Sequence, residues 1–222
     1  MIRTIYGANI RRGEVFPETE ETTDVSGIVS EIIENIRKNG DAALKEYTKK
    51  FDKAELESLI VTQEEIEEAF REVEENYIRI LKTARDNIEN YHKRQVRSSY
   101  IISEEKGIVL GQKVIPMERV GLYVPGGTAA YPSTVLMNSV PAKLAGVSEL
   151  VMVTPPMKNG KVNPIILAAA KIGGVDTVIK TGGAQAVAAL AYGTESVPRV
   201  DKIVGPGNVF VQEAKKQVFG KV

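Results

Sequence analysis

The sequence predicts an α/β fold, in which a parallel β-sheet domain at residues 119–222 follows a mainly helical segment with a small β hairpin. Residues 119–222 contain four short apolar runs about 25 to 30 residues apart, close to the length of one βαβ unit. Each run is followed by a Gly, Pro or Asn cluster and then by a helical pattern, which is typical of a parallel sheet. Residues 24–91 instead place their apolar side chains at helical spacing.

The first half begins with residues 1–23, which show no periodicity and are expected to form an extended N-terminal arm. From Asp24 the apolar residues recur at helical spacing until Asn39-Gly40, where we expect the helix to stop. Asp41 is a suitable cap for a shorter second helix that carries Leu44, Tyr47 and Phe51.

A longer helix and a hairpin complete the first half. Thr62-Gln-Glu-Glu65 matches a capping box, and the apolar steps of three and four that follow predict one long amphipathic helix as far as Tyr91. Residues 98–118 then change to β-like composition. The runs Tyr100-Ile-Ile102 and Ile108-Val-Leu110, separated by a Glu-Glu-Lys-Gly turn, predict a small hairpin or antiparallel edge.

The second half alternates strands and helices. The four expected strands are Val120 to Val124, Leu150 to Val153, Thr177 to Ile179 and Lys202 to Val204. The four expected helices are Ser133 to Gly146, Pro164 to Gly173, Gly183 to Tyr192 and Asn208 to Phe219. Because crossovers between parallel strands are right-handed, all four loops that follow the strands are expected at the same end of the sheet.

Composition restricts the class of protein. The chain has 222 residues, 43% of them hydrophobic and 26% charged, as in an ordinary globular protein. It has no Cys, which excludes disulfides and thiolate metal sites and makes a cytoplasmic setting the default expectation. No run of about 18 apolar residues and no charged-then-apolar leader is present, which argues against a membrane span and a secretory signal.

Charge is distributed unevenly between the halves. Residues 1–118 carry 18 Lys and Arg against 24 Asp and Glu, a balance of −6, and residues 119–222 carry 11 against 5, a balance of +6. A positive second half suits an anionic small ligand such as a phosphate-bearing cofactor, and it equally suits lysines that only solvate an apolar domain. The basic residues are not interleaved with aromatic ones, so a nucleic-acid partner is not expected.

The loops after the four strands are the candidate binding elements, since ligands in open α/β sheets bind outside the carboxyl ends of the strands. Three of them are rich in Gly, and each is either a tight βα turn or part of a ligand site. None matches a dinucleotide fingerprint or a P-loop. The loops are Pro125-Gly126-Gly127 with Tyr123 before it, Thr154-Pro155-Pro156, Thr181-Gly182-Gly183-Ala184-Gln185 and Gly205-Pro206-Gly207-Asn208.

Catalytic and metal-binding groups are harder to find. The only histidine, His92, ends a charged helix and is expected to be a solvated surface residue. No His, Asp and Glu cluster has the spacing of a zinc site, and no general base accompanies a nucleophile. The acids of the second half mostly flank strands at the end away from the loops. We therefore assign no catalytic residue and no metal ligand in this chain.

Several segments nevertheless match one family in combination. The chain resembles L-histidinol dehydrogenase over essentially its whole length. The resemblance implies a Rossmann-like domain at residues 119–222, preceded by residues 24–118 as part of an incomplete first domain. The segments that carry it are Arg119-Val-Gly-Leu-Tyr-Val-Pro-Gly-Gly127, Tyr131-Pro-Ser-Thr-Val-Leu-Met-Asn138, Val140-Pro-Ala-Lys-Leu-Ala-Gly-Val147, Gly182-Gly-Ala-Gln-Ala186 and Val204-Gly-Pro-Gly-Asn-Val-Phe-Val211.

The resemblance also implies a function. The family oxidises L-histidinol through histidinal to L-histidine in histidine biosynthesis, with NAD and zinc, as a homodimer. By this resemblance Tyr123, Gln185 and Asn208 are NAD contacts, one on each of three loops. The zinc ligands and proton-transferring residues of the family come after the point that matches Val222, so catalysis by this chain alone is not expected. The alternative is an isolated nucleotide-binding or self-associating module without enzymatic activity.

Overall fold

A parallel sheet of four strands forms the centre of the molecule. The computed structural model describes residues 7, 24–126 and 130–222, and most of the predicted arm at residues 1–23 lies outside them. The strand order is β5-β4-β3-β6, and all pairs are parallel, as predicted. The strands are β3 (Arg119–Tyr123), β4 (Glu149–Thr154), β5 (Thr177–Lys180) and β6 (Lys202–Val204).

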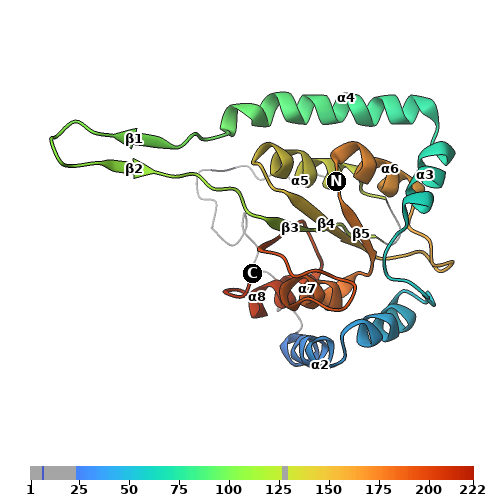
Figure 1. The fold of residues 1–222 in the computed structure, drawn as a ribbon. Coiled ribbons are helices and arrows are strands. Elements are labelled where there is room, and N and C mark those ends of the chain that lie inside the picture. Colours follow the sequence, from blue (N-terminus) through green and yellow to red (C-terminus); the bar gives the residue numbers. More distant parts are fainter. Residues whose placement is uncertain (1–6, 8–23, 127–129) are drawn as a thin grey trace.

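Four helices connect or follow these strands and cover both faces of the sheet (Figure 1). On one face lie α5 (Pro132–Leu144) and α6 (Pro164–Gly173), and on the other lie α7 (Gly183–Tyr192) and α8 (Val209–Gln217). Ala168 to Ala170 of α6 and Ala184, Ala186, Ala188 and Ala189 of α7 are buried. Such small side chains allow helices to approach a sheet closely, as the sequence suggested.

The strand order defines where the connections change direction. From β3 the chain proceeds outward through β4 to β5, and it then returns past β3 to place β6 on the opposite side. The topological switch point therefore lies between β3 and β6, where open α/β sheets form their ligand crevice. Tyr123 ends β3 at this point, and Gly205 follows β6.

The helices of the first half form outer layers over the same sheet domain. Helix α2 (Ser26–Phe51) packs on α7 and α8, whereas α3 (Gln63–Glu72) and α4 (Glu75–His92) pack on α6 and α5 (Figure 1). Residues from both sides of position 118 share each hydrophobic cluster. The domain boundary at 118 stays a prediction, but the two segments have a common core.

Helix boundaries give one confirmation and one correction. Gly40 has non-helical angles, φ 48° and ψ −129°, inside α2, so the predicted interruption at Asn39-Gly40 is confirmed. The single long helix expected from Thr62 to Tyr91 is wrong, because extended angles at Val73 and Glu74 separate α3 from α4. Apolar periodicity continues across this break, since both helices turn an apolar face toward α6. The predicted capping box of Thr62 is present.

A two-stranded hairpin extends from the end of α4. A short 3₁₀ helix (Lys93–Gln95) leads to β1 (Tyr100–Ile102), which pairs antiparallel with β2 (Leu110–Gln112). The hairpin projects away from the helices and the sheet (Figure 1). Its apolar side chains are exposed, and Ile101 is 78% exposed. The predicted hairpin is thus confirmed, and within the described residues its apolar faces have no covering layer.

Candidate functional site at the carboxyl edge of the sheet

The loop after β4 is the packing centre of the carboxyl edge. A Cβ atom at Gly126, in the loop after β3, would overlap the ring of Pro155. At Gly182, in the loop after β5, it would lie 2.9 Å from Cβ of Pro155. Only glycine permits this approach from both sides, so packing between loops accounts for these two glycines. Gly127, the other glycine of the first loop, lies outside the described residues.

Tyr123 links β3 to the beginning of α7. Its side chain is only 5% exposed, and its hydroxyl accepts a hydrogen bond from the backbone N–H of Gly183 at 3.0 Å. Burial raises the pKa of Tyr123, the hydrogen bond from Gly183 lowers it, and the carboxylate of Asp52 raises it further. The phenol is therefore neutral at physiological pH and satisfies one of the N–H groups at the start of α7.

Gln185 lies in the first turn of the same helix and is 2% exposed. Its amide folds back over Gly183, where an added Cβ atom would lie 3.0 Å from Nε2 of Gln185. The structure therefore brings Tyr123 and Gln185 together at the N-terminus of α7. Both side chains are buried, so they shape the wall of the crevice more than its open surface.

Asn208 lies across the switch point at the start of α8, and its side chain is exposed. Its Oδ1 atom accepts a hydrogen bond from the N–H of Val211 at 3.2 Å, which confirms the predicted helix cap. The loop before it packs tightly, since a Cβ atom at Gly205 would overlap the backbone of Tyr123. This contact connects the loop after β6 to the end of β3.

Side chains of α8 hold the backbone of the same loop. Nζ of Lys215 donates to the carbonyl oxygen of Gly205 at 2.6 Å, and Nε2 of Gln212 donates to that of Gly207 at 3.1 Å. Burial lowers the pKa of Lys215. Two carbonyl groups are thus fixed from the α8 side, which restrains the loop that carries Asn208.

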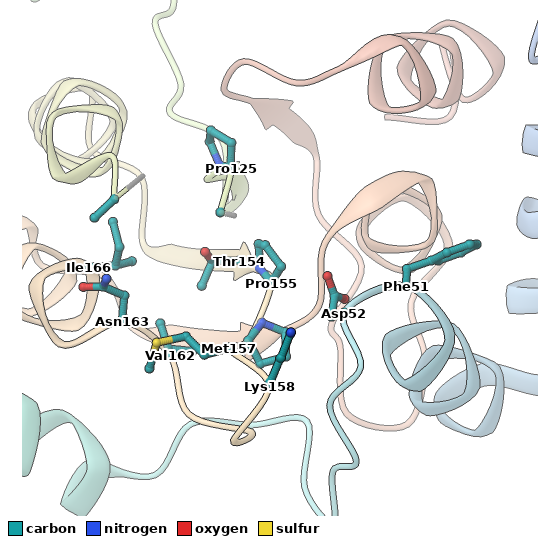
Figure 2. Close-up of a pocket in the computed structure, with 13 residues that line it drawn as sticks. Phe51, Asp52, Pro125, Thr154, Pro155, Met157, Lys158, Val162, Asn163 and Ile166 are labelled. Atoms are coloured by element: carbon teal, nitrogen blue, oxygen red, sulfur yellow. The ribbon is translucent and has the colours of Figure 1, made fainter. Parts of the chain in front are cut away.

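A pocket of about 430 Å³ opens beside these loops, between the ends of β3 and β4 and the start of α6. Phe51 and Asp52, from the end of α2, also line it, and Asp52 lies on the same side as Pro155, opposite Asn163 and Ile166 (Figure 2). Oδ2 of Asp52 is buried and has no hydrogen-bond partner among the described residues. Burial raises the pKa of Asp52 to about 6.

Asp52 was missed in the sequence because no local motif surrounds it. Its position depends on the packing of α2 against the sheet domain, which helical periodicity alone does not reveal. An acidic residue at the end of a helix is ordinarily only a solvated terminus.

Most acids of residues 119–222 lie away from the loops, as predicted, and Glu149, Asp176 and Asp201 lie at the opposite, amino edge of the sheet, whereas Glu213 lies in α8. Glu149, at the start of β4, pairs with Arg119 at 2.6 Å. Asp176 accepts from the N–H of Leu150 at 2.7 Å, and Asp201 accepts from that of Arg119 at 2.9 Å. These carboxylates connect strand ends and are distant in the topology from the candidate crevice.

Residues 7, 24–126 and 130–222 contain no group of three or more His, Asp or Glu that is arranged to hold a metal ion. None of the helices in these ranges is long and apolar enough to cross a membrane.

Comparison with known proteins identifies the family. The sequence model described as histidinol dehydrogenase matches residues 17–222. The chain belongs to the histidinol dehydrogenase family. The histidinol dehydrogenase of Clostridium acetobutylicum is 59% identical over 203 residues, which cover 91% of this chain and 47% of that protein. The Syntrophotalea carbinolica histidinol dehydrogenase is 56% identical over 218 residues, covering 97% of this chain and 49% of that protein.

The fold agrees with this membership. A crystal structure of histidinol dehydrogenase from Elizabethkingia anophelis matches with a TM-score of 0.88 and 39% identity. The match covers 91% of this chain and 47% of that one. The resemblance found in the sequence and the predicted α/β fold are therefore confirmed. The chain spans about half the length of the relatives that it matches.

Proposed function

We propose that this chain supplies the NAD-binding part of an L-histidinol dehydrogenase. That enzyme oxidises L-histidinol through L-histidinal to L-histidine, in the cytoplasm, as a step of histidine biosynthesis. Membership of the family supports the proposal. The observation that carries it is the convergence of the loops after β3, β5 and β6 at the topological switch point, with the Tyr123 hydroxyl bonded to the start of α7.

The residues at this crevice fit a dinucleotide. Helix α7 has no side-chain cap from its own N-cap residue, and the N-terminus of a helix favours an anion such as a pyrophosphate. We assign Tyr123, Gln185 and Asn208 as NAD contacts. Tyr123 and Gln185 orient the first turn of α7, and Asn208 presents its exposed amide from the loop after β6. When bound, NAD accepts the hydride that the substrate loses.

Zinc binding is not proposed for the described residues of this chain. Within the described residues no cluster of ligands fits a zinc ion, so zinc is assigned to none of them. Substrate oxidation is proposed for the whole protein, because the histidinol dehydrogenases that match are about twice as long as this chain. This chain contributes cofactor binding and the scaffold that places the cofactor.

Binding of NAD is the direct test, measured by isothermal titration calorimetry on the purified chain. We expect Asn208→Asp to weaken NAD binding, because it keeps the cap oxygen but loses the amide donor. Asn87→Asp, an exposed change on α4 with the same loss of an amide, is the control. Equal dissociation constants for wild type and Asn208→Asp would remove Asn208 from the site, and no NAD binding by wild type would reject the proposed function.

Gln185 is tested separately because it is buried. Gln185→Met keeps the volume and length of the side chain but removes its polar atoms. We expect this variant to bind NAD at least about tenfold more weakly, as expected for a lost hydrogen bond to a ligand. Its melting temperature, measured alongside, separates lost binding from lost folding.

One observation favours a second role. The hairpin of β1 and β2 exposes apolar side chains on both faces, and an isolated two-stranded hairpin is only marginally stable in water. We propose that it contributes to homo-oligomer formation.

A further inference from the structure

Asp52 lines a pocket at the carboxyl edge that none of the three proposed NAD contacts lines. It is the residue after the last turn of α2, and its backbone N–H donates to the carbonyl oxygen of Thr48 at 2.9 Å. Lys53, directly after it, has a positive φ of 58°, so the chain turns sharply away from the helix. The side chain of Asp52 is therefore left at the wall of the pocket formed by the loops after β3 and β4.

The carboxylate of Asp52 has an unmet capacity to accept hydrogen bonds. Within residues 24–126 and 130–222, the buried Oδ2 atom has no hydrogen-bond partner, while the residue as a whole is partly buried. Buried carboxylates are ordinarily satisfied by donors, because desolvation without a partner is costly. The pKa of about 6 agrees with this, since burial is its cause and no donor offsets it. A ligand that brings hydroxyl donors would satisfy the group.

The location of Asp52 relative to the sheet indicates which donors these are. In open α/β sheets that bind NAD, an acidic residue near the end of the second strand accepts hydrogen bonds from the ribose hydroxyls. Here the second strand is β4, and Thr154-Pro155-Pro156 follows it without an acid. Asp52 lines the same pocket as Thr154 and Pro155, although it comes from α2 (Figure 2).

Asp52 also shares its surroundings with a proposed cofactor contact. Its charge is one of the causes that raise the pKa of Tyr123, so the two groups interact through the same part of the protein. The other charged side chain that lines the pocket is Lys158, which forms no ion pair with Asp52 among the described residues. Lys158 favours a phosphate, whereas Asp52 favours hydroxyl donors and repels a phosphate.

We infer that Asp52 accepts hydrogen bonds from the vicinal hydroxyls of the adenosine ribose and selects NAD against NADP. The 2′-phosphate of NADP would replace one of these donors with a dianion beside a carboxylate. The inference rests on the proposed NAD-binding function and assigns Asp52 a part in it. A cofactor-binding crevice is thereby completed by a helix from outside the βαβ units.

The test compares the dissociation constants of NAD and NADP, measured by calorimetry at pH 7.5. We expect wild type to bind NAD at least about tenfold more tightly than NADP. Asp52→Asn should weaken NAD binding by about tenfold and bring the ratio of the two constants close to one. Asp86→Asn, an exposed aspartate on α4, makes the same change in charge and should alter neither constant.

The outcomes distinguish the inference from the function on which it rests. An unchanged NAD to NADP ratio in Asp52→Asn overturns the role of Asp52 and leaves NAD binding intact. Tighter binding of NADP than NAD by wild type also overturns it, and would indicate that Lys158 dominates the pocket. Absence of NAD binding by wild type overturns both.

A second measurement uses the wild-type chain and does not depend on a variant that folds. The pKa of the Asp52 carboxyl is followed by carbon NMR with and without saturating NAD. Ribose hydroxyls that donate to the carboxylate stabilise its charged form, so the pKa should fall from about 6 when NAD binds. A pKa that stays constant or rises on saturation overturns the inference.

Discussion

The hydroxyl of Tyr123 and the backbone N–H of Gly183 form a hydrogen bond of 3.0 Å that joins the end of β3 to the start of α7. The two residues are far apart in sequence, and the bond lies where the parallel strands end. A tyrosine that the sequence marks as a ligand contact therefore also has a structural task.

Tyr123→Phe should lower the free energy of unfolding by about 1 kcal/mol, because it leaves a partly buried N–H at the start of α7 without its acceptor. Urea denaturation followed by circular dichroism measures the change. Tyr91→Phe removes a hydroxyl from a side chain that is 68% exposed and serves as the control. Equal stability of the two variants would contradict a structural role for the Tyr123 hydroxyl.

The largely buried ion pair between Lys180 and Glu65 should contribute more to the free energy of unfolding than the more exposed pair between Lys171 and Glu67. Nζ of Lys180 lies 2.6 Å from Oε1 of Glu65, and their side chains are 9% and 24% exposed. Glu65→Gln leaves a buried ammonium without a counter-charge, which should cost about 3 kcal/mol of unfolding free energy.

The matched control is on the same helix. Glu67 pairs with Lys171 at the same distance of 2.6 Å, but the side chains are 43% and 34% exposed. Glu67→Gln should therefore cost less than about 1 kcal/mol. If the two substitutions had equal effects in urea denaturation, burial of the Lys180–Glu65 pair would be energetically unimportant.

The stability that the Asp41 carboxylate contributes should be lost in acid. Burial raises the pKa of Asp41, but hydrogen bonds from Ser196 and Thr194 outweigh it and hold the pKa below the ordinary value of 3.8. A depressed pKa contributes stability that is complete above the unfolded value and is lost as the pH falls through the folded value.

The test is to measure the unfolding free energies of wild type and Asp41→Asn between about pH 2.5 and 7. This range extends to both sides of the ordinary carboxyl pKa. We expect Asp41→Asn to be less stable by about 1 kcal/mol at pH 7, the difference between a charged and a neutral acceptor. The gap should narrow below about pH 4. A constant gap across this range would show that the Asp41 charge is not the source of the stability.

The hairpin should be a self-association surface. Ile101 and Leu110 are 78% and 63% exposed and lie in its two strands. Ile101→Glu should shift the protein toward monomer in light scattering, because it places a charge in the apolar surface. Met137→Glu, on an exposed apolar residue of α5, is the control. A wild type that is already monomeric would refute the role of the hairpin.

Local patterns predicted the parallel sheet because each strand is a short apolar run followed by Gly, Pro or Asn, although only β3, β4 and β5 are largely buried. They did not predict the break at Val73 and Glu74, since the helical spacing of apolar residues persists through it. They also did not predict that α2, α3 and α4 cover both faces of the sheet domain. An amphipathic pattern indicates that one face of a helix is covered, but it does not indicate which other element covers that face.

The candidate site also has residues that the sequence could predict and one that it could not. Tyr123, Gln185 and Asn208 were selected from glycine-rich loops and from the family resemblance, and the structure places the first two side by side at α7. Their assignment as NAD contacts stays a prediction. Asp52 could not be selected, because it meets the loop after β4 only through the tertiary packing of α2.

The wedging of Pro155 between Gly126 and Gly182 has a consequence for motion. The loops after β3 and β5 touch the same proline ring, and the loop after β6 packs on the backbone of Tyr123. Gly126, Gly182 and Gly205 are therefore closely packed against neighbouring loops. The amide hydrogens of these three loops should exchange with solvent as one cooperative unit, and a ligand bound at any one loop should slow exchange in all three.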